Sequence, residues 1–244
     1  MGFILLLLIG FFVLRSMSNI LPSQWTQSSS NRWSGMRYDF QSSLISLIAY
    51  MMKADGHARK VELDFVRPQL IRIFGETQAR QALLQLREML KNNIEFYEVT
   101  QVINRSLDEQ SKCTILSILY GIAMADGVLA NEEWQMLIRI TDYIGLSRHD
   151  LDTIRMMYGN YSDYSNNSDS QNSQAESIES SYKILGVSPS ASDEQVKKAY
   201  RTLVKKFHPD MLTNLSKEAQ EDAQKRFVKI QEAYEKVCSV RNIK

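Results

Sequence analysis

Apolar residues recur at helical spacing from about residue 36 to residue 158, and again from about residue 180 to the end. Because successive helical residues turn by about 100°, this spacing places the apolar side chains on one stripe of each helix. Only four prolines interrupt the chain. The pattern therefore predicts an all-α protein, in which the helices bury their apolar stripes against one another.

Two helices are expected near the carboxyl end. Ser192 followed by Gln195 is a capping-box pattern, which predicts a helix from the next residue, 193. Pro209 cannot continue a helix and disfavours helical angles at His208, so this helix should end near Phe207. A second helix should begin near residue 216. The two apolar stripes predict an antiparallel helical hairpin, and they consist of Val196, Tyr200, Leu203 and Phe207 on one side and Phe227, Ile230, Tyr234 and Val237 on the other.

The loop at the tip of this hairpin is His208-Pro209-Asp210, and it lies beside a basic helix face. From residue 180 onward there are thirteen Lys and Arg against eight Asp and Glu, whereas the rest of the chain has sixteen against twenty. A basic surface attracts acidic partners, and charge alone leaves both nucleic acid and acidic protein open. The aromatic side chains lie on the apolar stripes and are not free to stack on bases, so we expect a protein partner and no nucleic acid.

The segments Tyr182-Lys183-Ile184-Leu185-Gly186-Val187, His208-Pro209-Asp210 and 227–234 resemble, in this order and spacing, the J domain of DnaJ-type co-chaperones. The resemblance implies a non-enzymatic protein that binds the ATPase domain of a DnaK-type chaperone and stimulates its ATP hydrolysis. Met211 departs from the basic residue common after the tripeptide, and the loop from 212 to 217 is longer than in the simplest J domains. The residues that the resemblance assigns to chaperone binding are His208, Pro209, Asp210, Lys197, Lys198, Arg201, Lys205, Lys206 and Tyr200.

The middle of the chain contains an internal repeat with an offset of seventy-one residues. It superposes the apolar residues of 44–51 on those of 115–122, and Ala54-Asp55-Gly56 on Ala125-Asp126-Gly127. Each copy predicts an apolar helix stopped by a glycine, a turn, and a second helix with acidic residues early. Two such hairpins, with linking helices at 79–90 and 96–107, predict an all-α bundle.

This repeat resembles the TerB-like domain associated with tellurite resistance. Asp55, Glu62, Asp126 and Glu133 would converge as oxygen ligands for a divalent cation. The stronger interpretation is structural, because Asp before Gly favours a turn and an early Glu stabilises a helix start. We therefore expect no metal and no cofactor. The sequence also lacks a phosphate-binding glycine loop and a nucleophile paired with a base.

Residues 2–14 form a run of apolar or small residues that ends at Arg15, shorter than the roughly 20 residues of a full membrane span. A secretory signal peptide would need a positive start and a small-residue cleavage site, and neither is clear. A buried helix is disfavoured so near the end. A short membrane anchor fits best, and Arg15, Arg32 and Arg37 after the run place the bulk of the chain in the cytoplasm.

The two cysteines, Cys113 and Cys238, are expected to be free thiols, because each lies in an apolar helical pattern without a nearby ligand partner. Residues 160–177 are dominated by Ser, Asn, Asp and Gln, which predicts a flexible tether. We therefore expect a membrane anchor at 1–21, a polar linker at 22–35, a TerB-like helical domain at 36–159, a flexible linker at 160–178 and a J domain at 179–244.

This order is similar to that of the membrane-anchored DnaJ-like co-chaperones of Gram-negative bacteria. The resemblance implies an inner-membrane protein with a short periplasmic amino terminus, and a homodimer formed through the membrane segment. The alternative is a TerB-like sensor of metal or envelope stress, with the J domain as adaptor.

Overall fold

The structure, a computed structural model, describes residues 40–54, 60–92, 95–125, 127–159, 173–212 and 215–243. The predicted anchor and the linker after it lie outside these ranges, as does most of the predicted tether. Within the described ranges, no helix combines the length and the apolar character needed to cross a bilayer. These ranges are also without strands, so the predicted all-α fold is confirmed for them.

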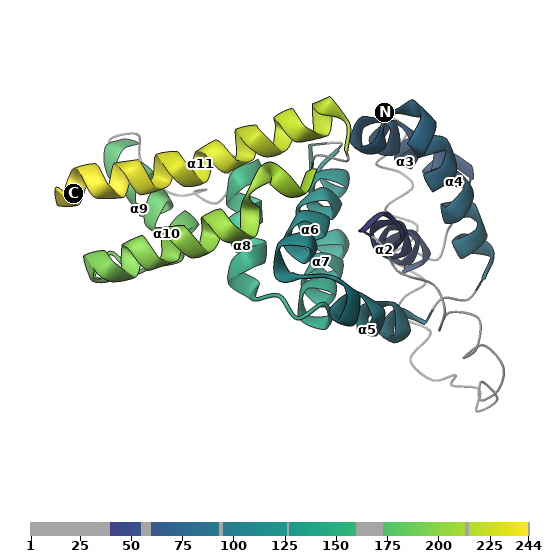
Figure 1. Cartoon of the computed structure of the whole chain (residues 1–244), viewed down its shortest axis with the longest axis horizontal. Coiled ribbons are helices and arrows are strands. Elements are labelled where there is room, and N and C mark those ends of the chain that lie inside the picture. Colours follow the sequence, from purple (N-terminus) through teal and green to yellow (C-terminus); the bar gives the residue numbers. More distant parts are fainter. Residues whose placement is uncertain are drawn as a thin grey trace.

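Seven helices form the first unit and three form the second, counted over the described residues (Figure 1). The first unit contains α2 (Phe40–Ala54), α3 (Lys60–Phe74), α4 (Glu76–Lys91), α5 (Phe96–Ser106), α6 (Glu109–Ala123), α7 (Asn131–Tyr143) and α8 (Arg148–Tyr158). The second contains α9 (Ser173–Leu185), α10 (Asp193–Phe207), the 3-10 turn η2 (Pro209–Leu212) and α11 (Lys217–Arg241).

The first unit is a helical bundle built around the two copies of the repeat. The apolar helices α2 and α6 contact each other, and Leu44 and Leu47 of α2 are as fully buried as Ile115 and Leu119 of α6. Helices α4, α5 and α7 pack on α2, and α7 and α8 pack on α6. The offset that the sequence shows therefore places the two apolar helices of the repeat, α2 and α6, together at the centre of the bundle, whereas α3 packs on α4 and α7 packs on α6.

The second unit is the predicted hairpin with one further helix packed along it. Ser192 caps α10, since its hydroxyl accepts the Gln195 amide and the Gln195 side chain accepts the Ser192 amide. The stripes of α10 and α11 meet, and the rings of Tyr200 and Tyr234 stack with centroids 4.0 Å apart. Helix α9 packs along α11 and begins at Ser173, within the segment predicted to be a linker.

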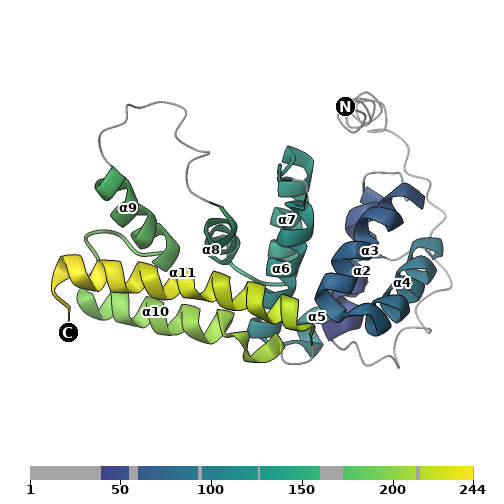
Figure 2. The same ribbon diagram turned by 90° about the horizontal axis from the view of Figure 1, so that it is seen from above.

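The two units pack against each other, and the tip of the hairpin is the end that meets the bundle (Figures 1 and 2). Helix α10 contacts α6, the start of α11 lies beside α3, and α9 and α11 contact α8. The opposite end of the hairpin, with the carboxyl terminus, points away from the bundle. The His208-Pro209-Asp210 loop therefore lies at the boundary between the units.

Candidate functional site

The tip loop is shaped by Pro209, which ends α10 and begins the single turn η2. His208 has an extended backbone, and its ring packs edge-on against Phe227 of α11 with centroids 5.5 Å apart. The Asp210 side chain is 82% exposed, and its Oδ2 lies 3.1 Å from Nδ1 of His208. The loop thus presents a carboxylate to solvent, while the imidazole is held between that carboxylate and the hairpin core.

Among the basic residues of α10, several are exposed, and Lys206 is engaged by the bundle. Lys198, Arg201 and Lys205 are exposed, and Lys197 is half-buried on the same helix. Tyr200 belongs to the core of the hairpin through its stacking on Tyr234. The exposed group leaves a positive surface leading to the tip loop, as the sequence predicted.

Lys206 is the engaged residue, because its ammonium group lies between two acidic residues of the bundle. Its Nζ is 2.9 Å from Asp150 of α8 and 2.9 Å from Glu109 of α6, and its side chain is only 16% exposed. Burial alone would lower the pKa of Lys206, but hydrogen bonds to both carboxylates outweigh it and the pKa is raised. Lys206 is therefore held as a cation at the boundary.

Asp150 is buried, and hydrogen bonds satisfy its carboxylate. It accepts the Ser147 amide at 2.9 Å, the Ser147 hydroxyl at 2.6 Å and the Lys206 ammonium at 2.9 Å. Burial would raise the pKa of Asp150, but the hydrogen bonds from Ser147 and Lys206 prevail and lower it. A buried carboxylate of this kind depends on its cation, since an unpaired buried charge is costly.

Two further contacts hold the tip itself. The Gln110 side chain of α6 donates to the His208 carbonyl at 3.1 Å. Phe207, His208 and Leu212 line a cavity of about 120 Å³ together with Ile118 and Tyr158 of the bundle. The tip loop is thus bound on its inner side and open on the side of Asp210.

The start of α11 is attached to the end of α3 by charge and by backbone hydrogen bonds. Arg72 pairs with Glu218 at 3.1 Å and also with Asp222. The Ser216 amide donates to the Ile73 carbonyl at 2.9 Å, and the Ser216 hydroxyl also donates to the Arg72 carbonyl. These contacts hold the start of α11, the second helix of the hairpin, on the bundle.

Helix α8 holds the remaining side of the boundary. Arg226 of α11 lies over the Tyr158 ring at 4.6 Å, a cation–π contact. The Thr153 hydroxyl donates to the Ile184 carbonyl at the end of α9 at 3.3 Å. Each helix of the second unit is therefore attached to the bundle by at least one polar or cation–π contact.

The candidate cation ligands are only in part within the described residues. Asp55 and Asp126 lie outside them, as does the side chain of Glu62. Glu133 lies in the first turn of α7, where its carboxylate accepts the Ala130 amide at 2.9 Å. The described residues contain no cluster of three potential metal ligands. For Glu133, helix capping is the role that the geometry supports.

The sequence did not predict Glu109, Gln110 or Asp150 as part of this site. Each lies in the first turn of a helix, where an acidic or polar residue is normally explained by the helix dipole or by capping. Asp150 does complete a capping box with Ser147. The signal that could have pointed to them is the opposite net charge of the two parts of the chain.

Two families match the chain, and together they cover most of the helical residues that the structure describes, although the first part of α9 lies before the second match. The family described as tellurite resistance protein TerB matches residues 41–156, and the DnaJ domain matches residues 180–242. The first corresponds to the bundle and the second to the hairpin unit. Both resemblances inferred from the sequence motifs are confirmed.

Curated relatives match either most of the chain or the hairpin alone. The co-chaperone protein DjlA of Photobacterium profundum is 25% identical over 213 residues, covering 82% of this chain and 76% of the relative. The co-chaperone protein DjlA of Mannheimia succiniciproducens is 35% identical over 153 residues, 53% of each chain. The chaperone protein DnaJ of Mesomycoplasma hyopneumoniae is 57% identical over 54 residues, covering 22% of this chain and 15% of the relative. No solved structure matches the chain significantly.

Proposed function

Because this chain is a DjlA-like J-domain protein with a TerB domain before its DnaJ domain, we propose that it recruits a DnaK-type chaperone and stimulates the chaperone's ATP hydrolysis. The observation that carries the proposal is the tip loop, where an exposed Asp210 carboxylate stands at the end of the basic face of α10. A carboxylate in this position suits a charge-assisted hydrogen bond to an arginine on the partner.

The basic face and the tip loop have different roles in this proposal. Lys198, Arg201 and Lys205 attract an acidic surface of the chaperone's ATPase domain and raise the association rate. His208, Pro209 and Asp210 make the short-range contact, with Pro209 fixing the backbone between the two polar side chains. Lys197, Lys206 and Tyr200 complete the predicted surface, although Tyr200 acts mainly through the hairpin core.

The test is steady-state ATP hydrolysis by a DnaK-type chaperone, with and without the chain from residue 36 onward. Asp210→Asn should reduce the stimulation by about tenfold or more, the loss expected for one charge-assisted contact. His208→Gln should act in the same direction. Lys91→Gln, an exposed change on α4, is the control. Unchanged stimulation by Asp210→Asn and His208→Gln, with helical content preserved, would contradict the assigned site.

The location of this activity is part of the proposal. Residues 1–21 would anchor the chain in the bacterial inner membrane, with the short amino terminus in the periplasm and both domains in the cytoplasm. Tethering raises the effective concentration of the chaperone near that membrane, and pairing of two membrane segments would give a homodimer. In spheroplasts, external protease should remove an epitope at residue 1 and spare one at the carboxyl terminus; the reverse result would exclude this topology.

A further inference from the structure

The TerB domain contacts the J domain on the end that the proposed function requires. Of the residues assigned to chaperone binding, Lys206 is paired with Glu109 and Asp150, and the His208 carbonyl accepts the Gln110 side chain. Helix α6 lies beside the end of α10 and next to the tip loop (Figure 1). A large ATPase domain that approached the tip from this side would meet α6 first.

The bundle presents an acidic surface to the basic helix α10, as the chaperone partner implied by the J-domain resemblance would. A basic helix that binds an acidic surface finds two carboxylates on the bundle, one of them buried. The remainder of the chain before residue 180 carries the net negative charge that complements the basic J domain. At Arg72 the charges are reversed, because here the bundle supplies the cation, which pairs with Glu218 and Asp222 of α11.

The boundary has the character of a contact that can open. Its polar contacts are ion pairs, a side-chain amide and a cation–π contact, and a half-open cavity of about 120 Å³ lies between the units. Arg72 and Glu109 keep exposed fractions of 48% and 61%. Water and salt therefore compete for these charges, and each pair contributes modestly.

We propose that the TerB domain acts as an intramolecular inhibitor of the J domain, by holding Lys206 and the inner side of the tip loop in a docked state. This inference rests on the proposed function. The docked state leaves Asp210 and the outer basic face open for a first encounter, and full engagement of the chaperone requires the tip to leave α6. Only the released fraction binds with full affinity, so docking raises the chain concentration needed for half-maximal stimulation.

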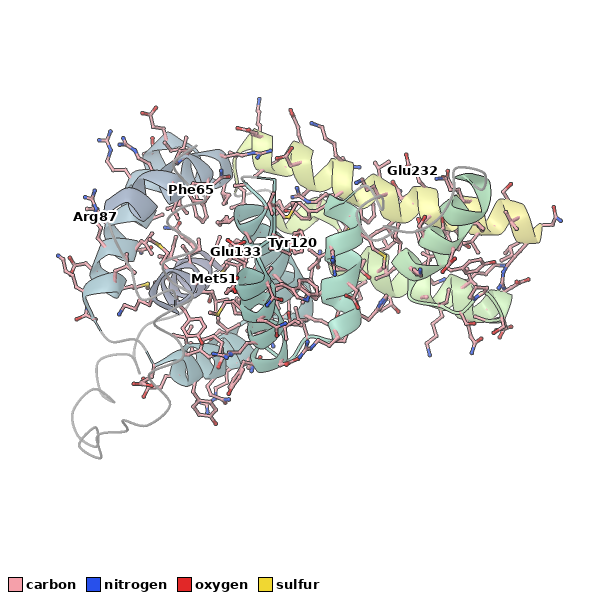
Figure 3. All side chains as sticks on the ribbon, turned by 180° about the vertical axis from the view of Figure 1, so that it is seen from behind. Met51, Phe65, Arg87, Tyr120, Glu133 and Glu232 are labelled. Atoms are coloured by element: carbon pink, nitrogen blue, oxygen red, sulfur yellow. The ribbon has the colours of Figure 1, made fainter. Side chains whose placement is uncertain are left out.

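The test uses the full chain in mild detergent with two charge reversals on the TerB side, Arg72→Glu and Glu109→Lys. These changes lie outside the assigned chaperone-binding residues and leave the net charge unchanged. Arg87→Glu with Glu98→Lys is the matched control, because it makes the same charge changes at exposed positions of α4 and α5. Arg87 projects from the side of the bundle away from the J domain (Figure 3), and Glu98, like Glu109, is in the first turn of its helix.

Two quantities are measured: hydrogen–deuterium exchange over residues 207–222, and the concentration giving half-maximal ATPase stimulation. The Arg72→Glu/Glu109→Lys variant should show faster exchange over these residues and should reach half-maximal stimulation at a concentration about three- to tenfold lower. The control variant should match the parent chain in both quantities. Faster exchange without a change in that concentration would overturn the inference, and so would unchanged exchange or weaker stimulation. Absence of stimulation by every form would instead overturn the proposed function, while exchange would still report docking.

Discussion

Two neighbouring lysines at the end of α10 have opposite surroundings. Lys206 is 16% exposed between Asp150 and Glu109, whereas Lys205 is exposed on the outer face. Helical geometry separates them by about 100°, which is enough to place one in the domain boundary and the other in solvent. Adjacent identical residues therefore differ in role: Lys206 joins the two units, whereas Lys205 remains accessible for the proposed partner binding.

Replacement of these lysines should separate the two roles. Lys206→Met leaves the buried Asp150 without its cation, and we expect a loss of about 2–3 kcal/mol in the free energy of unfolding. Lys205→Met should change it by less than about 0.5 kcal/mol. Urea denaturation followed by circular dichroism measures both, and equal midpoints for the two variants would show that the Asp150 pair does not stabilise the docked protein.

The two free cysteines differ in accessibility and should differ in reactivity. Cys113 of α6 is fully buried, and burial raises the pKa of its thiol well above the ordinary range. Cys238 of α11 is only partly buried. Because the thiolate is the reactive form, the native chain should react with one equivalent of a maleimide at Cys238 and with a second only after unfolding. Mass spectrometry identifies the sites, and a Cys113 adduct in the native chain at a similar rate would contradict the burial.

At the scale of elements, the end of α9 shows how local sequence and domain packing meet at one glycine. Gly186 has a φ of +67°, a conformation that favours glycine, and the Val187 amide closes the helix end on the Tyr182 carbonyl. A side-chain carbon at this position would lie 2.0 Å from Nε2 of His149 on α8. Gly75, with a φ of +76°, has open space instead.

This pair of glycines gives a controlled test of the α8–α9 contact. Gly75→Ala should cost about 1 kcal/mol from backbone strain alone. Gly186→Ala should cost more, because the His149 ring must also move. Adding His149→Ala should bring the cost of Gly186→Ala close to that of Gly75→Ala. Denaturant midpoints are measured for the parent chain, both glycine variants, His149→Ala and the Gly186→Ala/His149→Ala double variant. Equal costs for the two glycine variants would mean that the close approach does not affect stability.

Across the whole molecule, the charged boundary predicts a pH dependence of docking. The pKa of Asp150 lies below its ordinary value of 3.8 in the docked state, despite burial, because Ser147 and Lys206 donate to it. Its contribution to docking is present above that ordinary value and is lost as the pH falls through the lowered one. The pKa of Lys206 is raised, so its contribution is lost only at high pH. Glu109 and Cys113 of α6 also face this pair.

Small-angle X-ray scattering tests whether docking is lost at low pH. The radius of gyration should be constant from pH 8 to pH 5 and should increase only once the pH falls below 3.8, the ordinary pKa of the carboxyl, as Asp150 takes up a proton. Circular dichroism at each pH separates domain release from loss of helix. The Asp150→Asn chain should be less compact already at neutral pH and should lack the acid step; a step of the same size in that variant would exclude Asp150 as its origin.

The features that depend on short sequence segments were predictable. The start of α10 follows from the Ser192 cap and its end from Pro209, and both agree with the structure. The repeat of 44–51 at 115–122 predicted two apolar helices, and these form the centre of the bundle. The free thiols of Cys113 and Cys238 were also expected and are confirmed. Such features are local, because capping, proline geometry and helical periodicity act within about one or two turns.

The contacts between the domains depended on tertiary structure alone. Asp150 and Glu109 look like ordinary helix-start residues, and Lys206 looks like one more lysine of a solvated face. Lys206 meets Asp150 and Glu109 from positions 56 and 97 residues further along the chain. The segment 160–177, which joins the two domains, gives no sequence signal of how they are oriented. The sequence by itself therefore determined the two helical domains and the tip loop, whereas only the three-dimensional packing decided that the loop faces α6.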